Sequence, residues 1–245
     1  MLIFAKSLPL APGMCCLSAV VASYMMLNAC GPDFGPPGPE RTETRSIPLD
    51  QSEEVRVDLK MGAGELRVRG GADGLMDGRF TYNRLRLRPV ISYDASGFRG
   101  HLAVEEPGHV GGSTHKYLWD LSFNDHKPLD LNVKCGAGES RLDLEDLTLR
   151  RVDIEMGVGE LRMDLRGEPK QDYSVHIHGG IGEATVYLPQ NVGIEADVKG
   201  GIGDIQTAGL QKRNGRYVND AYGRVTTTVH LDIEGGIGSI HLIAN

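Results

Sequence analysis

Six glycine pairs, each split by one residue, are the part of this chain that most resembles a chemical site. They occur in stretches such as MGAGELRV (61–68), MGVGELRM (156–163) and GGIGEATV (179–186). Glycine-rich turns of this kind bind phosphate through backbone N–H groups in nucleotide-binding proteins. The twelve glycines are Gly62, Gly64, Gly136, Gly138, Gly157, Gly159, Gly180, Gly182, Gly201, Gly203, Gly236 and Gly238.

The residues that follow each pair argue against these ligands. A P-loop needs Lys and Ser/Thr after its last glycine and then a helix, and a dinucleotide site needs a third glycine and a helix. Every pair here leads into alternating apolar and polar residues, the period of a β-strand. GGIGD (200–204) is similar to the calcium-binding nonapeptide, but Asp204 comes one position early and the repeat is much longer. We therefore predict structural corners, where positive φ or a close neighbour excludes a Cβ, and no cofactor or metal.

The remaining titratable residues fall into columns that repeat with the glycines. A carboxylate follows most pairs, and an arginine often comes two residues later: Glu65, Glu139, Glu160, Glu183 and Asp204, with Arg67, Arg141 and Arg162. We interpret these columns as solvent-facing and mutually neutralising, the alternative being a cation-binding ladder. His176 and His178 also share an outward face, and without a third ligand we interpret them as solvated. No nucleophile with a base, metal cluster or carboxylate pair stands apart, so we predict that the protein is not an enzyme.

The spacing of the pairs predicts a repeat architecture. Their second glycines lie at 64, 138, 159, 182, 203 and 238, so the gaps are 74, 21, 23, 21 and 35 residues. Each unit has strand periodicity on both sides of its corner and cannot bury its apolar side alone. Stacked units bury one continuous interior. We predict an all-β fold, a β-solenoid of Gly-x-Gly-cornered coils with an N-terminal antiparallel β insertion.

The insertion interrupts the repeat at residues 80–128. The stretches RFTYN, PVISYD, GHLAVEE and YLWDLSFND predict strands, and DASGFRG predicts a turn between two of them. Arg84, Arg86 and Arg88 alternate with leucines and predict the wet face of a strand. Trp119 and Phe123 supply the bulk to close the open end of the stack. The longest later excursion, 208–224, carries Tyr217 and Tyr222 among charges and is predicted to be the contact surface.

The N-terminus has the pattern of a secretory signal. Residues 1–29 carry a single charge, Lys6, then an apolar stretch, and the signal ends in LNAC (27–30). The last four residues resemble a bacterial lipobox, which implies that Cys30 carries a diacyl-type lipid anchor; the alternative is a transmembrane anchor. Cys135 would then be the one cysteine left, without a disulfide partner. We expect a cell-envelope location, on the outer side of the cytoplasmic membrane or at the outer membrane.

The predicted organisation is a signal peptide (1–29), a Pro/Gly-rich tether (30–46), an N-terminal β region (47–128) and a repeat solenoid (129–245). The net charge of −7 and the lack of a basic cluster argue against a nucleic-acid partner. The stretches WDLSFNDHKPLDLNVKCGAGESRLDLEDLTLRRVDIEMGVGELRMDL and TVYLPQNVGIEADVKGGIG resemble the bacterial toast-rack domains, related to the C-terminal region of LiaF-type envelope-stress regulators. That resemblance covers about residues 50–243 and implies a non-enzymatic β-solenoid with no agreed ligand.

Three hypotheses for function follow. The first is an envelope interaction or sensing module in the envelope-stress response, with a protein or cell-envelope polymer as its partner. The second is an adhesin-like or self-assembling surface protein, since the ends of a solenoid offer unpaired strand edges. The third is an enzyme acting on polysaccharide, as some long β-helices do. Because LiaF-type proteins carry transmembrane helices where this chain has a lipobox, direct regulation of a membrane kinase is not expected.

Overall fold

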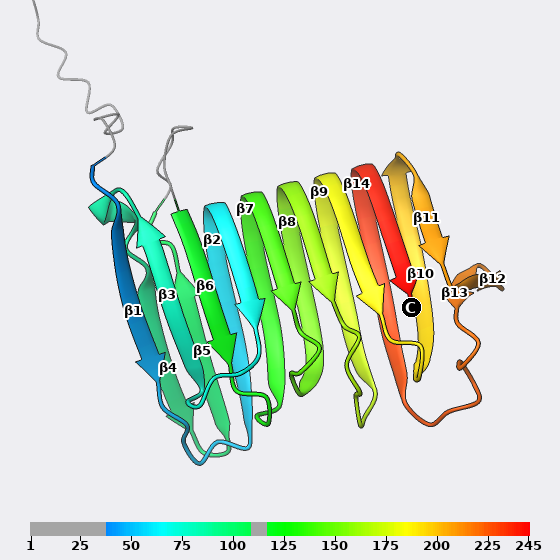
Figure 1. Cartoon of the computed structure of the whole chain (residues 1–245), viewed down its shortest axis with the longest axis horizontal. Helices are drawn as coiled ribbons and strands as arrows, with labels where there is room; N and C mark the ends of the chain where they lie inside the picture. Colours follow the sequence, from blue (N-terminus) through cyan, green and yellow to red (C-terminus); the bar gives the residue numbers. More distant parts are fainter. Residues whose placement is uncertain (1–37, 109–116) are drawn as a thin grey trace, which may run out of the picture. The chain divides into compact units, whose positions relative to one another are not determined.

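The computed structural model describes residues 38–108 and 117–245, and the predicted signal peptide and Cys30 lie outside them. Five of the repeats are single long strands that bend at their glycine pairs: β2 (Glu54–Arg69), β7 (Leu129–Asp143), β8 (Leu149–Asp164), β9 (Tyr173–Leu188) and β14 (Thr228–Ala244). The sixth is interrupted after its corner and forms β10 (Gly193–Ile202) and β11 (Ile205–Ala208). Each bent strand is one coil, with a first arm before the glycines and a second arm after them (Figure 1).

The coils pair in parallel and in register, so equivalent residues stack. Gly64 lies beside Gly138, which lies beside Gly159, then Gly182 and then Gly238. Apolar side chains of both arms point inward and form one continuous buried core from Val55 to Ala244. The predicted all-β solenoid of Gly-x-Gly-cornered coils is confirmed.

The order of the coils in space differs from their order in sequence. The stack runs β2, β7, β8, β9, β14, β10, so the last strand of the chain is inserted between β9 and β10 (Figure 1). β14 pairs with β9 from Val229 to Ala244, and on its other side with β10 and β11. The terminal coil, β10 and β11, therefore comes before β14 in the sequence, and β14 lies between that coil and β9.

The N-terminal insertion completes the other end of the stack. β5 (Arg99–Glu105) pairs in parallel with the first arm of β2, and β6 (Tyr117–Phe123) with its second arm. β4 (Val90–Ser96) then adds antiparallel to β5, and β3 (Met76–Tyr82) to β6. β2 is itself a full coil and pairs with β7, so the stack of coils begins before residue 128. Trp119 and Phe123 are fully buried at this end, with Trp119 beside Phe80 and Phe123 beside Met76.

Two local predictions were wrong. β1 (Arg41–Ile47) pairs with β3 over its whole length, so the ordered fold begins inside the predicted tether. Its alternating Thr and Arg residues fit an edge strand, and this outweighs the Pro/Gly content just before it. The Arg84–Arg88 segment is not a strand, because Leu85–Leu87 forms a 3₁₀ turn, η1, in which only Leu87 is buried.

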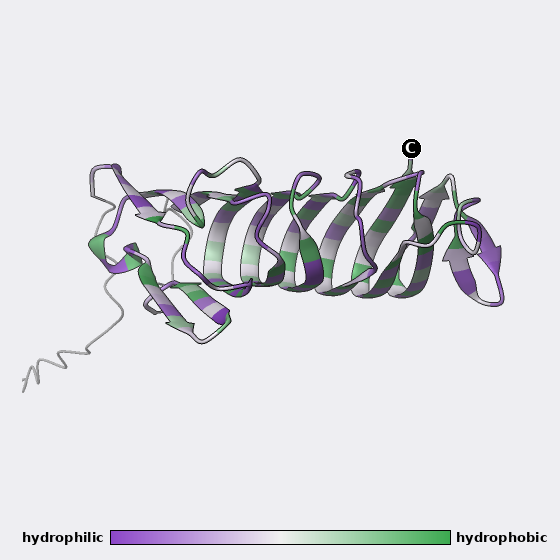
Figure 2. Cartoon of the chain, turned by 90° about the horizontal axis from the view of Figure 1, so that it is seen from below, coloured by the Kyte–Doolittle hydropathy of each residue, from purple (hydrophilic) through white to green (hydrophobic). Residues whose placement is uncertain are grey.

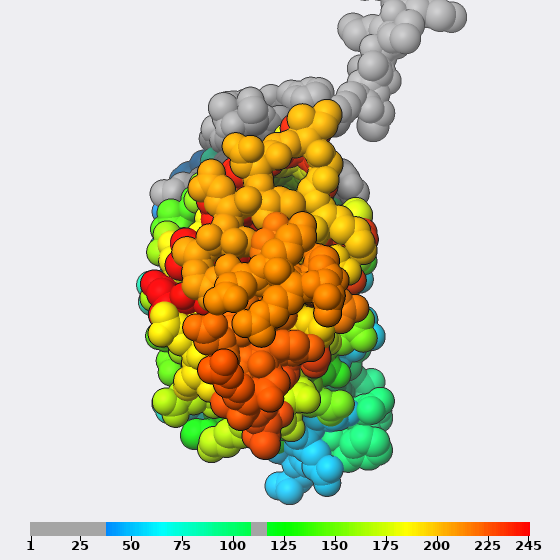
Figure 3. Space-filling model, turned by 90° about the vertical axis from the view of Figure 1, so that its right-hand side faces the viewer, coloured from blue at the N-terminus to red at the C-terminus, as the bar shows by residue number. Residues whose placement is uncertain are grey.

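The 208–224 excursion is largely a structural cap. Within it, β12 (Gln211–Arg213) and β13 (Arg216–Val218) form a hairpin, and β13 pairs with β10 at Glu195 and Ala196. Buried Asn219 accepts hydrogen bonds from the N–H groups of Ile194 and Tyr222 and donates one to the Val192 carbonyl. Figure 3 shows this segment, in orange, covering the C-terminal end of the stack. Replacing it with a glycine linker would remove the strand that pairs with β10.

Within residues 38–108 and 117–245, no helix has the length and apolar character needed to cross a bilayer. Seen from below, the strands carry alternating hydrophilic and hydrophobic bands along their length (Figure 2).

Candidate interaction surface

The glycine pairs meet their neighbours through backbone atoms. Gly64, Gly138, Gly159, Gly182, Gly203 and Gly238 all have φ between +131° and +153°. A Cβ on Gly180 would overlap the carbonyl oxygen of Gly157 in the adjacent coil, and one on Gly182 would overlap that of Gly159. The space in which a phosphate would need to lie against these glycines is therefore taken up by the next coil.

The residue between the two glycines of each pair is the exposed part of the corner. These residues stack in register from coil to coil and form a continuous apolar row, here named the corner stripe: Ala63, Ala137, Val158, Ile181, Ile237 and Ile202. Val158, Ile181, Ile237 and Ile202 are 52%, 52%, 49% and 73% exposed. A contiguous row of exposed branched side chains is unusual on the surface of a soluble domain, which makes the corner stripe a candidate contact site.

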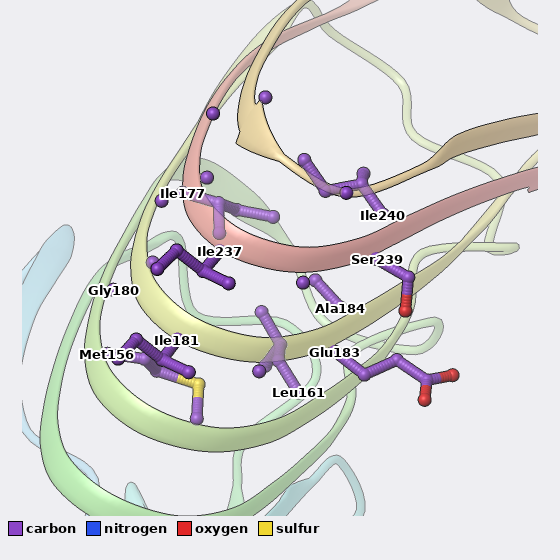
Figure 4. A pocket seen from close by; sticks show the side chains of 18 of the residues that line it. Met156, Leu161, Ile177, Gly180, Ile181, Glu183, Ala184, Ile237, Ser239 and Ile240 are labelled. Carbon is purple, nitrogen blue, oxygen red and sulfur yellow. The ribbon is translucent and has the colours of Figure 1, made fainter.

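Beneath the stripe, one coil is underpacked. In most coils a large side chain fills the inside of the corner, either before the glycine pair, as Met156 does, or after it, as Ile240 does. β9 has Gly179 and Ala184 at these two positions. A cavity of about 60 Å³ results, lined by Met156, Leu161, Ile177 and Ile240 among others (Figure 4).

We expect Ala184→Ile to stabilise the protein, because the new side chain fills this cavity as Ile240 fills its own corner. The gain should be about 1 kcal/mol, seen as a higher midpoint in thermal unfolding. Ala196→Ile is the matched control, because Ala196 is fully buried on an inward position of β10 and does not line this cavity. It should destabilise through overpacking. A lower midpoint for Ala184→Ile would show that the corner is already filled.

An acidic column flanks the stripe on the second arms. Glu65, Glu139, Glu160 and Glu183 stack in register, followed by Ser239. Arg67 and Arg141 bind Glu65 and Glu139 at 2.6 Å, and the hydrogen bond from Arg141 to Glu139 raises the pKa of the arginine. Arg162 instead lies over the Tyr187 ring, 4.7 Å from its centroid. Glu160 is therefore left without an ion pair among the described residues. Asp204 makes none there either, because a glutamine, Gln206, stands two residues after it.

The first arms carry a mixed column on the other side of the stripe. It runs Lys60, Lys134, Glu155, His178, Glu234 and Lys199 along the stack. Lys134 binds Glu155 at 2.7 Å, and Glu234 lies 3.6 Å from His178 and 3.3 Å from Lys199. His176 lies between Asp153 and Asp232 in the next column. Across the part of the chain that the structure describes, no three His, Cys, Asp or Glu residues are placed to hold a metal ion.

One pair that the sequence did not reveal is His101 with Asp58, joined at 2.6 Å. Burial opposes ionisation of Asp58, but hydrogen bonds from His101, Arg56 and Asn132 outweigh it and lower the pKa of this carboxyl. A His–Asp pair orients the base in hydrolase triads. Among the described residues, no hydroxyl or thiol hydrogen-bonds to His101.

A second polar cluster holds the C-terminal cap. Glu195 accepts hydrogen bonds from Arg216 at 2.6 Å and from the Tyr222 hydroxyl at 2.8 Å, with His230 at 3.1 Å. The Arg216 contact is the main cause of the lowered pKa of Glu195. This cluster connects the 208–224 segment to β10 and β14. The hydroxyl of Tyr222 therefore has a structural role, as a hydrogen-bond donor to Glu195.

Comparisons with known proteins agree with this geometry. The family described as the N-terminal domain of toast_rack, DUF2154, matches residues 36–187, and the cell wall-active antibiotics response LiaF C-terminal family matches residues 136–242. A structure described as a candidate cell adhesion protein from Clostridium sporogenes ATCC 15579 has 28% identity and a TM-score of 0.80, covering 84% of this chain and 100% of that one. A candidate adhesin from Bacteroides fragilis NCTC 9343 has 10% identity, coverage of 85% and 100%, and a TM-score of 0.32. No curated protein matches the chain.

Proposed function

Because the chain belongs to the toast-rack family, and its similarities are to LiaF-type and adhesin-like proteins, we propose that it is a non-catalytic contact module of the bacterial cell envelope. The contact is made through the corner stripe.

The observation that carries the proposal is the contrast between the stripe and the faces beside it. The outward charges of the arms largely pair with one another, as Lys60 does with Glu105 and Lys134 with Glu155. The branched residues of the stripe are not covered by any side chain of the described residues to that extent and remain between 49% and 73% exposed. Burying apolar surface is the main driving force of association, at about 25 cal/mol per Å². A partner would therefore gain the most binding free energy by covering the corner stripe.

The adhesion role is supported by the relative from Clostridium sporogenes, whose whole length the similarity covers. A sensing role in the envelope-stress response is the second candidate. It is favoured by the LiaF-type match, which spans residues 136–242 and so includes all four branched residues of the stripe. Both roles use the same contact surface and differ in what the contact triggers.

We further propose that Cys30 anchors the protein to the membrane through lipid. The lipobox-like LNAC at 27–30 supports this, and acyl chains are needed because a net charge of −7 disfavours adhesion to an anionic membrane. Either membrane of the envelope is compatible with the proposal.

Photo-crosslinking in intact cells tests the contact. A photoreactive amino acid at position 181 of the full chain should give a discrete adduct, because Ile181 lies within the stripe. The matched control is position 90 on β4, since Val90 is 54% exposed but lies away from the corner. Equal adducts at both positions, or none at 181, would overturn the proposal. Cys30→Ala should release the protein from the membrane fraction and weaken the adduct at 181.

A further inference from the structure

We propose that the partner of the corner stripe is a second copy of this chain, bound as a two-fold pair whose stacks run in the same direction. The inference rests on the proposed function, because it names the occupant of the same surface. The contact module would then act as a dimer.

The repeat of the stripe is the first reason. Its residues recur once per coil, at the spacing of neighbouring strands, about 4.8 Å. A second copy presents an identical row with an identical repeat, so every branched side chain meets an equivalent one along the whole seam. Two-fold association of like surfaces is also the commonest form of oligomer.

Charge complementarity is the second reason, and it sets the direction. In a parallel pair with its two-fold axis along the stripe, the acidic column of each copy faces the mixed column of the other. Asp204, which makes no ion pair within the described residues, then faces Lys199 of the second copy. Glu139 faces Lys134 and Glu65 faces Lys60, beside the ion pairs that these four residues already make within one copy. Glu183 faces His178, Ser239 faces Glu234, and one like pair, Glu160 with Glu155, remains.

An antiparallel pair would be less favourable. Its two-fold axis crosses the stripe, so each acidic column meets the other acidic column, and Glu160 would face Glu183. Like charges placed opposite each other across a contact are destabilising. The parallel pair also places both β1 strands at the same end of the assembly.

Cysteine crosslinking of the full chain in intact cells tests the pair. Val158→Cys, Ile181→Cys and Ile202→Cys should each form a disulfide-linked dimer on mild oxidation, because in the parallel pair each residue meets its own equivalent. Val225→Cys is the control, since Val225 is exposed but lies outside the stripe. The unmodified chain controls for its own cysteines, of which Cys135 is buried. We expect at least tenfold more dimer from each stripe variant than from either control.

A charge swap tests the direction independently of disulfide chemistry. Asp204→Lys should reduce several-fold the amount of one tagged copy that is recovered with another. In the pair, the new lysine of each copy would face Lys199 of the other copy. Lys199→Glu in the same chain should restore recovery. Asp204 and Lys199 are exposed, so both variants should melt within a few degrees of the wild type.

The outcomes separate the two proposals. Dimer from Ile181→Cys alone, with none from Val158→Cys or Ile202→Cys, would overturn the parallel arrangement. Crosslinking no greater than in the controls, together with an adduct at position 181 to a different protein, would overturn pairing while leaving the contact function intact. Neither a dimer nor any adduct at position 181 would overturn both.

Discussion

Gly182→Ala is expected to destabilise the protein by about 3 kcal/mol or more, with a large fall in its unfolding midpoint. Gly182 has a φ of +149°, which side chains bearing a Cβ rarely adopt, and its new methyl group would overlap the Gly159 carbonyl oxygen. That oxygen belongs to the backbone of the adjacent coil, so no rotamer change can relieve the overlap. The strand must move, and with it the register of the neighbouring corner.

Gly179→Ala in the same coil is the matched control. A Cβ there would meet no atom within 4 Å, and the backbone is outside the left-handed region. We expect this variant to be neutral or up to about 1 kcal/mol more stable, because alanine restricts the unfolded chain more than glycine does. Glu160→Gln, on the exposed flank, should change stability by less than about 0.5 kcal/mol. Thermal melts followed by far-UV circular dichroism would measure all three, and similar shifts for Gly182→Ala and Gly179→Ala would contradict the corner geometry.

Trp119→Ala is expected to have the second large effect, a loss of roughly 3–5 kcal/mol. Trp119 is fully buried on β6, where it stands opposite Leu66 of β2 on one side and Phe80 of β3 on the other. Its ring meets Phe80 and Tyr117 edge to face, with centroid distances of 5.8 and 5.6 Å. It therefore joins the antiparallel N-terminal strands to the first coil, and its removal opens a cavity at that junction.

The measurement must avoid fluorescence, because Trp119 is the single tryptophan of the chain. Thermal melts by circular dichroism should show a midpoint lower by on the order of 10 °C. Phe98→Ala is the control, since Phe98 is 57% exposed in the turn between β4 and β5. If Phe98→Ala lowered the midpoint as far as Trp119→Ala, the N-terminal end would not be closed by the tryptophan.

The amino-acid sequence determined the local structure of this protein. Alternation of period two, broken by a glycine pair, predicts a strand, a corner and a second strand, because both signals arise within about ten residues. The outward columns followed from the same alternation: Glu65 and Glu139 stack as predicted, whereas the place of His176 beside Asp153 emerged only from the structure. The strands of the 80–128 insertion followed too, apart from the turn at Leu85–Leu87.

The sequence did not determine which coil lies beside which. All coils share one pattern, so the pattern alone does not show that β14 lies between β9 and β10. That place depends on how the 208–227 segment returns across the end of the stack. That long-range choice makes 208–224 a cap on the end of the stack, and it brings Ile237 between Ile181 and Ile202. The exposure of the corner stripe and the cavity at Gly179 and Ala184 also depend on neighbouring coils. Packing between equivalent units is a property of the assembled stack, and only the tertiary structure decided it.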